Sequence, residues 1–198
     1  MRYQIAILCV ISLLVAGCGG RSQDDQTLTV IREGRGDKLN NPSKKVVRGL
    51  LRDPAAAANV SHVWLMNIDL ADPEWSHLQE LSKLEGVTGF SFFDTQNTDA
   101  FVETILAREQ LKLLAFYETD LSDVGLGQLA QASQLTELRI DSAGGGISTT
   151  GLSKLVAIPG LKKVHLISDK KLDAKKLKSL FPNSEIITEY VPPSLWDK

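Results

Sequence analysis

Few side chains in this sequence are suited to catalysis or metal binding, and their spacing does not assemble a reactive site. His62, His77 and His165 stand far apart, and none belongs to a His-Glu-x-x-His motif that could hold zinc. The chain also has no Gly-x-Ser-x-Gly nucleophile motif and no phosphate-binding loop. We expect His62 and His165 to be exposed strand residues. The sequence therefore predicts a protein that is not an enzyme and needs no metal or cofactor.

Three aspartates, Asp72, Asp99 and Asp123, could suggest carboxylate chemistry, but each stands at the expected start of a helix. A carboxylate there is favoured by the unpaired N–H groups of the first helical turn. Asp72 precedes a proline and an apolar series with three-residue spacing: Trp75, Leu78, Leu81 and Leu84. Further helices are expected to open at Thr98-Asp99, at Ser122, and at Ser148 or Thr149.

Cys18 has the clearest chemical expectation in the chain. A basic Arg2 is followed by 11 mostly apolar residues, Ile5 to Val15, which is too short to span a bilayer but typical of a secretory signal. The next residues, up to Ala16-Gly17-Cys18, resemble the lipobox of bacterial lipoproteins. The resemblance implies cleavage before Cys18 and a diacylglycerol on its sulfur. The alternative is an ordinary secretory signal or an uncleaved anchor, with Cys18 incidental.

The charge balance limits the classes of partner. The 198 residues carry a net charge of −2, which becomes −3 once residues 1–17, with Arg2 as their one charged side chain, are removed. This excludes a strongly basic nucleic-acid-binding protein and gives no electrostatic reason to bind anionic lipid. Because the other cysteine, Cys9, would leave with the signal, no disulfide is expected.

One phrase, apolar-x-x-apolar-x-apolar, recurs along the chain at intervals of 24 to 27 residues. A fixed period in this range predicts a solenoid, in which each unit buries its apolar face against its neighbours. A further strand is expected around Ile186-Ile187. The phrase begins at Val60, Val87, Leu111, Leu135 and Leu161.

The series resembles the leucine-rich repeat family over roughly residues 60–190, with the ribonuclease-inhibitor-like and cysteine-containing subtypes nearest in unit length. The best portions are Leu111–Ala130 and Leu135–Leu166. The resemblance implies an α/β solenoid of about five to six repeats, with parallel strands on the concave side and helices on the convex side. It also implies that Thr95 and Thr119 satisfy backbone groups in the turns. Ile68 and Ala143 depart from that pattern, and residues 144–146, all glycine, suggest a looser turn.

The remaining segments are expected to flank these repeats. Residues 1–17 are the predicted signal peptide, 18–42 a lipidated cysteine with a flexible tether, 43–59 a helical cap, and 191–198 a closing tail. Thr27–Ile31 could form a short strand, but its polar surroundings favour a linker. Within the cap, Ser43 can begin a helix and Pro54 should end it.

Strand alternation then predicts an interaction surface. Positions 1, 4 and 6 of each phrase should point into the core, whereas positions 3, 5 and 7 should line the other face of the sheet. Apolar side chains gather there in the first three units and polar ones in the next, and such patches are common protein-binding sites. The alternative is that the linker covers this patch or that its aromatic rings pack on one another. The candidate binding residues are Trp64, Met66, Phe93, Leu113, Tyr117, Arg139 and Asp141.

The sequence as a whole favours a lipid-anchored, non-catalytic module on the outer side of a bacterial membrane, binding an unidentified protein or peptide. The alternative is a structural envelope protein that associates with itself or with the cell wall. Because repeat folds serve many roles, the assignment of binding rests partly on the fold.

Overall fold

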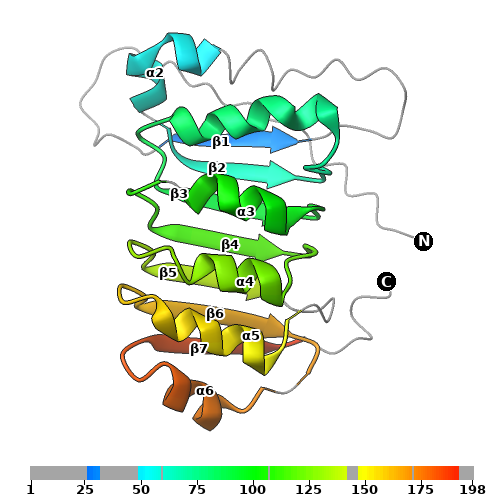
Figure 1. Ribbon diagram of the computed structural model, residues 1–198, viewed down its shortest axis with the longest axis vertical. Helices are drawn as coiled ribbons and strands as arrows, with labels where there is room; N and C mark the ends of the chain where they lie inside the picture. The colour runs from blue at the N-terminus through cyan, green and yellow to red at the C-terminus, as the bar shows by residue number, and fades with distance from the viewer. Residues whose placement is uncertain are drawn as a thin grey trace.

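The computed structural model describes residues 26–31, 49–58, 60–106, 108–141, 147–170 and 172–191. In this part of the chain the protein has an α/β fold, built on one parallel sheet whose seven strands lie in chain order (Figure 1). The expectations for the signal peptide, for Cys18, for the glycine turn at 144–146 and for residues 192–198 lie outside the described residues. The strands are β1 (Gln26–Ile31), β2 (Val60–Met66), β3 (Gly89–Phe93), β4 (Leu113–Tyr117), β5 (Glu137–Asp141), β6 (Lys163–Ser168) and β7 (Glu185–Tyr190).

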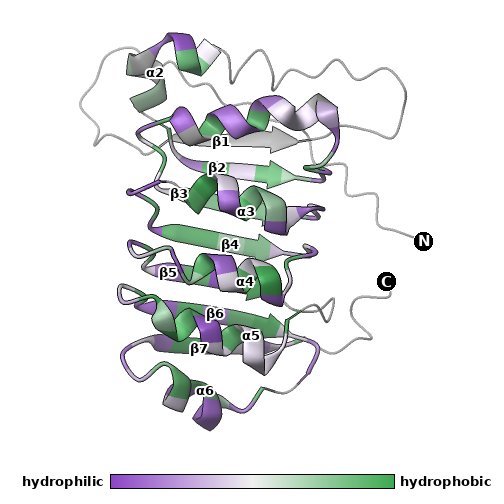
Figure 2. Ribbon diagram, viewed as in Figure 1, coloured by the Kyte–Doolittle hydropathy of each residue, from purple (hydrophilic) through white to green (hydrophobic). Residues whose placement is uncertain are grey.

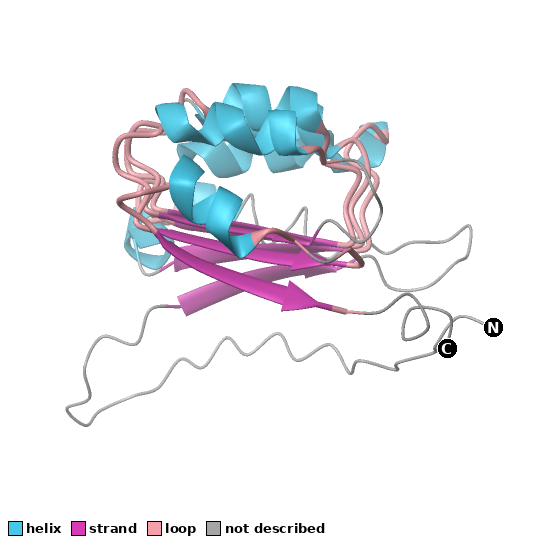
Figure 3. Ribbon diagram, turned by 90° about the horizontal axis from the view of Figure 1, so that it is seen from below, coloured by secondary structure: helices cyan, strands magenta, loops and turns pink. Residues whose placement is uncertain are grey.

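From β2 onward, helical segments alternate with the strands and lie on one side of the sheet (Figure 3). The opposite face of β3 to β7 is not covered by these helices. Figure 2 shows β4 and β6 as largely hydrophobic, whereas the helices mix hydrophobic and hydrophilic positions. The helical segments are α2 (Pro54–Ala58), η1 (Pro73–Lys83), α3 (Thr98–Leu106), α4 (Asp123–Leu129), α5 (Thr149–Lys154), η2 (Leu155–Ala157) and α6 (Ala174–Leu180).

The core lies between the sheet and the helices, and the predicted inward positions fill it. Positions 1, 4 and 6 of all five phrases are buried, from Val60 in the first to Leu166 in the last. Phe92 stacks on Phe116 of the next strand with ring centroids 5.0 Å apart. Burial of a large apolar side chain contributes about 1.5–3 kcal/mol, so this repeated column is the main source of stability.

The sheet begins one strand earlier than the tether prediction allowed. Residues 26–31 form β1, which pairs in parallel with β2, so that Thr27 lies opposite His62 and Ile31 opposite Met66. The prediction of a flexible tether over 18–42 is therefore wrong for this segment, and the short-strand alternative is confirmed. Backbone pairing along the edge of β2 stabilises the segment even though its sequence surroundings are polar.

The described part of the expected cap is helical. Residues 49–52 form a helical turn, and α2 begins at Pro54, where a missing N–H costs nothing. Leu50 and Leu51 pack on the core and Ala57 is buried. Ser43 lies outside the described residues, whereas the break at Pro54 is confirmed.

The helix expected after Asp72 forms, but as the 3₁₀ segment η1. A 3₁₀ helix has three residues per turn, so side chains spaced by three lie on one face. Trp75, Leu78, Leu81 and Leu84 have that spacing, and all four are buried. Their spacing therefore matches the geometry that is observed.

Aspartate–serine contacts tie consecutive units together. The Asp99 carboxylate accepts the Ser122 backbone N–H at 3.0 Å and its hydroxyl at 2.5 Å. Asp123 repeats this with Ser148, at 2.9 and 2.5 Å. Ser122 and Ser148 in turn accept a backbone N–H from the first turn of α4 and α5, as expected for caps. The starts of α4 and α5 are therefore each held by an aspartate of the preceding unit.

The turn role implied for the two threonines is also present. The buried Thr95 hydroxyl lies 3.2 Å from the Leu65 carbonyl oxygen and 3.1 Å from that of Phe93. The Thr119 hydroxyl accepts the Leu121 N–H at 3.4 Å. These bonds satisfy backbone groups at the end of the strands, where the chain leaves the ladder.

Candidate binding face of the sheet

The in-register sheet places equivalent positions of the phrase side by side on the face away from the helices. The predicted rows are confirmed, because neighbouring strands pair at these positions from β2 to β7. In the third row, Tyr117 and Asp141 fall one residue beyond the last pair of β4 and β5, Phe116 with Ile140. The first row is His62, Gly89, Leu113, Glu137, Lys163 and Glu185. The second is Trp64, Ser91, Ala115, Arg139, His165 and Ile187. The third is Met66, Phe93, Tyr117, then Asp141, Ile167 and Glu189.

The apolar candidates do lie together on this face, but they are only partly exposed. Met66, Phe93 and Tyr117 occupy neighbouring strands at one end of the face, and Trp64 and Leu113 lie on the same strands. All five have intermediate burial. The more exposed large hydrophobic residues lie elsewhere among the described residues: Val124 (65 %), Val156 (49 %) and Tyr190 (50 %).

Small residues between the large ones explain this partial burial. Ser91 and Ala115 are only 2 % and 1 % exposed, because larger neighbours cover them. The His62 ring covers Gly89, where an added Cβ would lie 2.4 Å from Nδ1. The His62 Nε2 atom also lies 2.9 Å from the Ser91 hydroxyl oxygen. The face is therefore closely packed around these small residues, and the His62 and Trp64 rings lie beside each other with centroids 6.1 Å apart.

The histidines do not form a reactive group. Burial, and then the positive charge of Arg139, lower the pKa of His62, so this ring is neutral at physiological pH. His77 is buried in η1, and His165 Nε2 lies 2.9 Å from the Glu189 carboxylate. Among the described residues, no three His, Cys, Asp or Glu side chains are grouped so that they could hold a metal ion.

Arg139, on the polar side of this face, is held by Glu137 and Tyr117. Its guanidinium lies 2.7 Å from the Glu137 carboxylate, and hydrogen bonds to Glu137 and then Tyr117 raise its pKa. Asp141 was expected to be open, but it is only 8 % exposed. Its row neighbours, Tyr117 and Ile167, are larger and flank it on both sides, so that prediction is wrong for Asp141.

Sequence reasoning missed an acidic rim beside the third row. Asp94 and Glu118 directly follow Phe93 and Tyr117, and both adopt positive φ, 47° and 51°. Burial, followed by repulsion from Asp141 and Asp94, raises the pKa of Glu118. The signal was position 8 of the phrase, which places an acid after the aromatic residue in two successive units.

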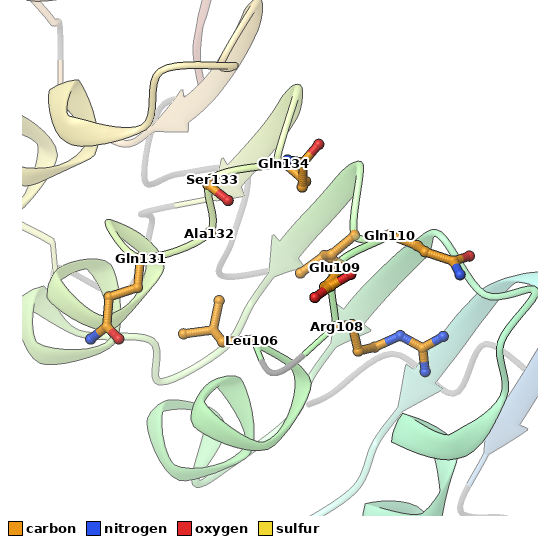
Figure 4. A pocket seen from close by; sticks show the side chains of 9 residues that line it. Leu106, Arg108, Glu109, Gln110, Gln131, Ala132, Ser133 and Gln134 are labelled. Carbon is orange, nitrogen blue, oxygen red and sulfur yellow. The ribbon is translucent and has the colours of Figure 1, made fainter.

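A separate surface depression of about 490 Å³ lies between the loops that lead into β4 and β5 (Figure 4). Its Arg108 side chain extends away from Gln131 and Ser133. That guanidinium donates to the carbonyl oxygens of Leu81 (2.7 Å), Val87 (2.9 Å) and Leu84. Arg108 is thus committed to capping the end of η1, and the other polar residues of the lining are Glu109, Gln110, Gln131, Ser133 and Gln134.

Comparison with known proteins adds no relative: no family model matches the chain, and no curated protein matches it in sequence. Among the residues that the structure describes, none of the helices has the length and apolar character needed to cross a bilayer.

Proposed function

We propose that the chain is a leucine-rich-repeat solenoid, anchored to a bacterial membrane through a lipid on Cys18, that binds a protein or peptide on its open sheet face. The observation that carries the proposal is the register, which sets Trp64, Met66, Phe93 and Tyr117 on adjacent strands of the face away from the helices. Aromatic and Met side chains are the usual anchors of protein interfaces.

The solenoid assignment rests on the period of the phrase and on its in-register stacking. A helix is about 10 Å wide, whereas neighbouring strands lie about 4.8 Å apart. Units that stack with all helices on one side therefore curve toward the strands, which makes the open face concave. A concave face surrounds more of a bound segment than a flat one does.

A non-catalytic role is favoured by the chemistry of the face. Two pairs of its charged groups are engaged with each other, Arg139 with Glu137 and His165 with Glu189. The arrangement offers shape, apolar area and fixed charges, which are the components of recognition.

The test is affinity capture from envelope extract with the soluble chain 19–198, which retains β1. A Phe93→Ala/Tyr117→Ala variant is compared with a Val124→Ala/Val156→Ala control that removes exposed apolar groups from the helix side. We expect wild type and control to retain the same partner and the face variant to lose it, while circular dichroism shows all three folded.

Sedimentation of the purified chain separates this proposal from the structural alternative. A binding module should sediment as a monomer. Concentration-dependent self-association, together with equal capture by the face variant, would instead favour the envelope-structural role.

A further inference from the structure

We propose that the occupant of the sheet face is an extended basic peptide, whose Lys or Arg side chain lies over the rings of Phe93 and Tyr117 beside the carboxylates of Asp94 and Glu118. This inference rests on the proposed binding function and gives its partner a chemical class. The third row supplies the aromatic surface, and the residues that directly follow β3 and β4 supply the negative charge.

The backbone places the two acidic residues next to the aromatic residues of the third row. The Asp94 N–H donates to the Tyr117 carbonyl oxygen at 3.1 Å, so the turn after β3 lies against the end of β4. Asp94 is exposed, and Glu118 keeps exposed surface although its neighbours partly desolvate it. Phe93 and Tyr117 are partly exposed. A ligand that reaches the third row therefore meets aromatic surface and negative charge together.

Among the residues that the structure describes, the charged groups that act on Glu118 at this rim are acidic. The charges that act on Glu118 are those of Asp141 and Asp94, and their repulsion raises its pKa. Arg139, the cation nearest in register, is occupied by Glu137 at 2.7 Å and by Tyr117. An incoming cation would relieve this repulsion, whereas an incoming anion would increase it or have to displace Glu137.

Aromatic faces add to the preference for a cation. A Lys or Arg group within about 6 Å of a ring centroid is attracted by the ring quadrupole, most strongly when it is partly desolvated. In an extended peptide, side chains on the same side recur about every 6.8 Å. A basic residue at the third row can thus be followed by an apolar one near Trp64, which is two positions from Met66 along β2.

The experiment measures the binding of two fluorescent peptides to the chain 19–198. One peptide repeats Lys-Ser-Leu-Ser, so that Lys and Leu share one side of the extended chain, the other repeats Glu-Ser-Leu-Ser, and both have Gly-Ser ends. We expect the Lys peptide to bind, with affinity that falls as salt rises, and the Glu peptide to bind at least tenfold more weakly.

Two charge-matched variants localise the effect. Asp94→Asn/Glu118→Gln should weaken binding of the Lys peptide about 3- to 30-fold, the range expected for a cation beside an aromatic ring and a carboxylate. Glu103→Gln/Glu109→Gln makes the same change in net charge at exposed positions elsewhere and should leave affinity unchanged.

The outcomes separate this inference from the proposed function. If neither peptide binds, if both bind equally, or if the two variants weaken binding equally, the basic-peptide inference is overturned. Capture that still depends on Phe93 and Tyr117 would then leave the binding function standing with a partner of different chemistry. Capture that is insensitive to those two residues would remove the binding function itself.

Discussion

At the scale of single residues, Asp123 shows how a surface carboxylate becomes structural. It accepts two hydrogen bonds from Ser148, which lower its pKa from the usual 3.8. Asp123→Asn should therefore reduce the free energy of unfolding by about 1 kcal/mol at pH 7. Because the folded pKa is the lower one, this stabilisation is complete above the unfolded pKa and is lost as pH falls through the folded value.

Urea denaturation of wild type and Asp123→Asn at pH 7 and pH 3 checks this. The difference between the two proteins should shrink at pH 3, whereas the exposed Glu109→Gln control should match wild type at pH 7. A difference that is constant with pH would show that Asp123→Asn acts through the geometry of its hydrogen bonds with Ser148 and not through the lost charge.

Glu118 presents the opposite case, because its native environment disfavours the charged form. Its φ of 51° suits Asn better than Glu, and its pKa is raised by burial and by Asp141 and Asp94. Glu118→Asn should raise the free energy of unfolding by about 0.5–1 kcal/mol at pH 7 while weakening binding of the Lys peptide. The electrostatic part of that gain should vanish below the unfolded pKa, since a group with a raised folded pKa destabilises only where it is ionised.

Denaturation at pH 7 and pH 3, run beside the peptide titration, measures both effects. Glu109→Asn is the control. A loss of stability at pH 7 would mean that the Glu118 side chain makes a contact that outweighs its strain and repulsion.

At the scale of elements, the glycines of α4 show what the contact between units requires. A Cβ on Gly125 would lie 2.2 Å from the Asp99 carboxylate, whereas one on Gly127 would meet only the flexible end of Lys154, at 3.3 Å. Gly125→Ala should therefore cost about 1–3 kcal/mol, because Asp99 must move away from Ser122. Gly127→Ala should stabilise α4 by about 0.5–1 kcal/mol, as expected for a helix interior.

Both variants replace a glycine of α4 by alanine, so the change in helix propensity is the same in both and cancels in the comparison. Denaturation midpoints with unchanged slopes would report the difference directly. Equal effects would show that Asp99 does not hold the start of α4.

The elements that the sequence predicted are those whose signals are local. The inward positions of the phrase and the Ser122 and Ser148 caps depend on residues within one unit and its neighbour. The polar surroundings of β1 predict a linker, whereas its stability comes from pairing with β2, more than thirty residues away in the chain. The three-residue spacing of the apolar residues in η1 matches a 3₁₀ helix, but the sequence alone predicts only a helix there, without its type.

The candidate site was predicted in outline, because period-two alternation assigns a face and constant register aligns the rows. The exposure of the side chains on this face could not be predicted, since it depends on which neighbours are small. Gly89 and Ala115 are small enough for larger side chains to cover them. The burial of Asp141 and the acidic rim likewise arise from contacts between strands. The sequence pattern of a single unit predicts neither feature.

At the scale of the whole molecule, the position of β1 limits how the protein can sit on a membrane. If Cys18 carries the lipid, eight backbone steps separate it from Gln26, the first residue of β1. Even a fully extended chain of that length spans only about 27 Å. The β1 end of the sheet, and with it the aromatic rows of β2 to β4, would then be confined near the bilayer. A partner would have to reach that zone.

This orientation predicts unequal energy transfer to an acceptor in the bilayer from two labelled variants. Labels at Lys83→Cys, at the end of η1, and Lys175→Cys in α6 are separated by at least four strand spacings, about 19 Å. In liposomes carrying the lipidated chain, the label at position 83 should transfer more efficiently. Insertion of 30 Gly/Ser residues after Ser22 should abolish the difference, because such a linker has a mean span of about 30 Å. Equal transfer from both labels with the native spacing would show that the sheet lies flat on the membrane, and the aromatic face would then be as close to lipid at β6 as at β2.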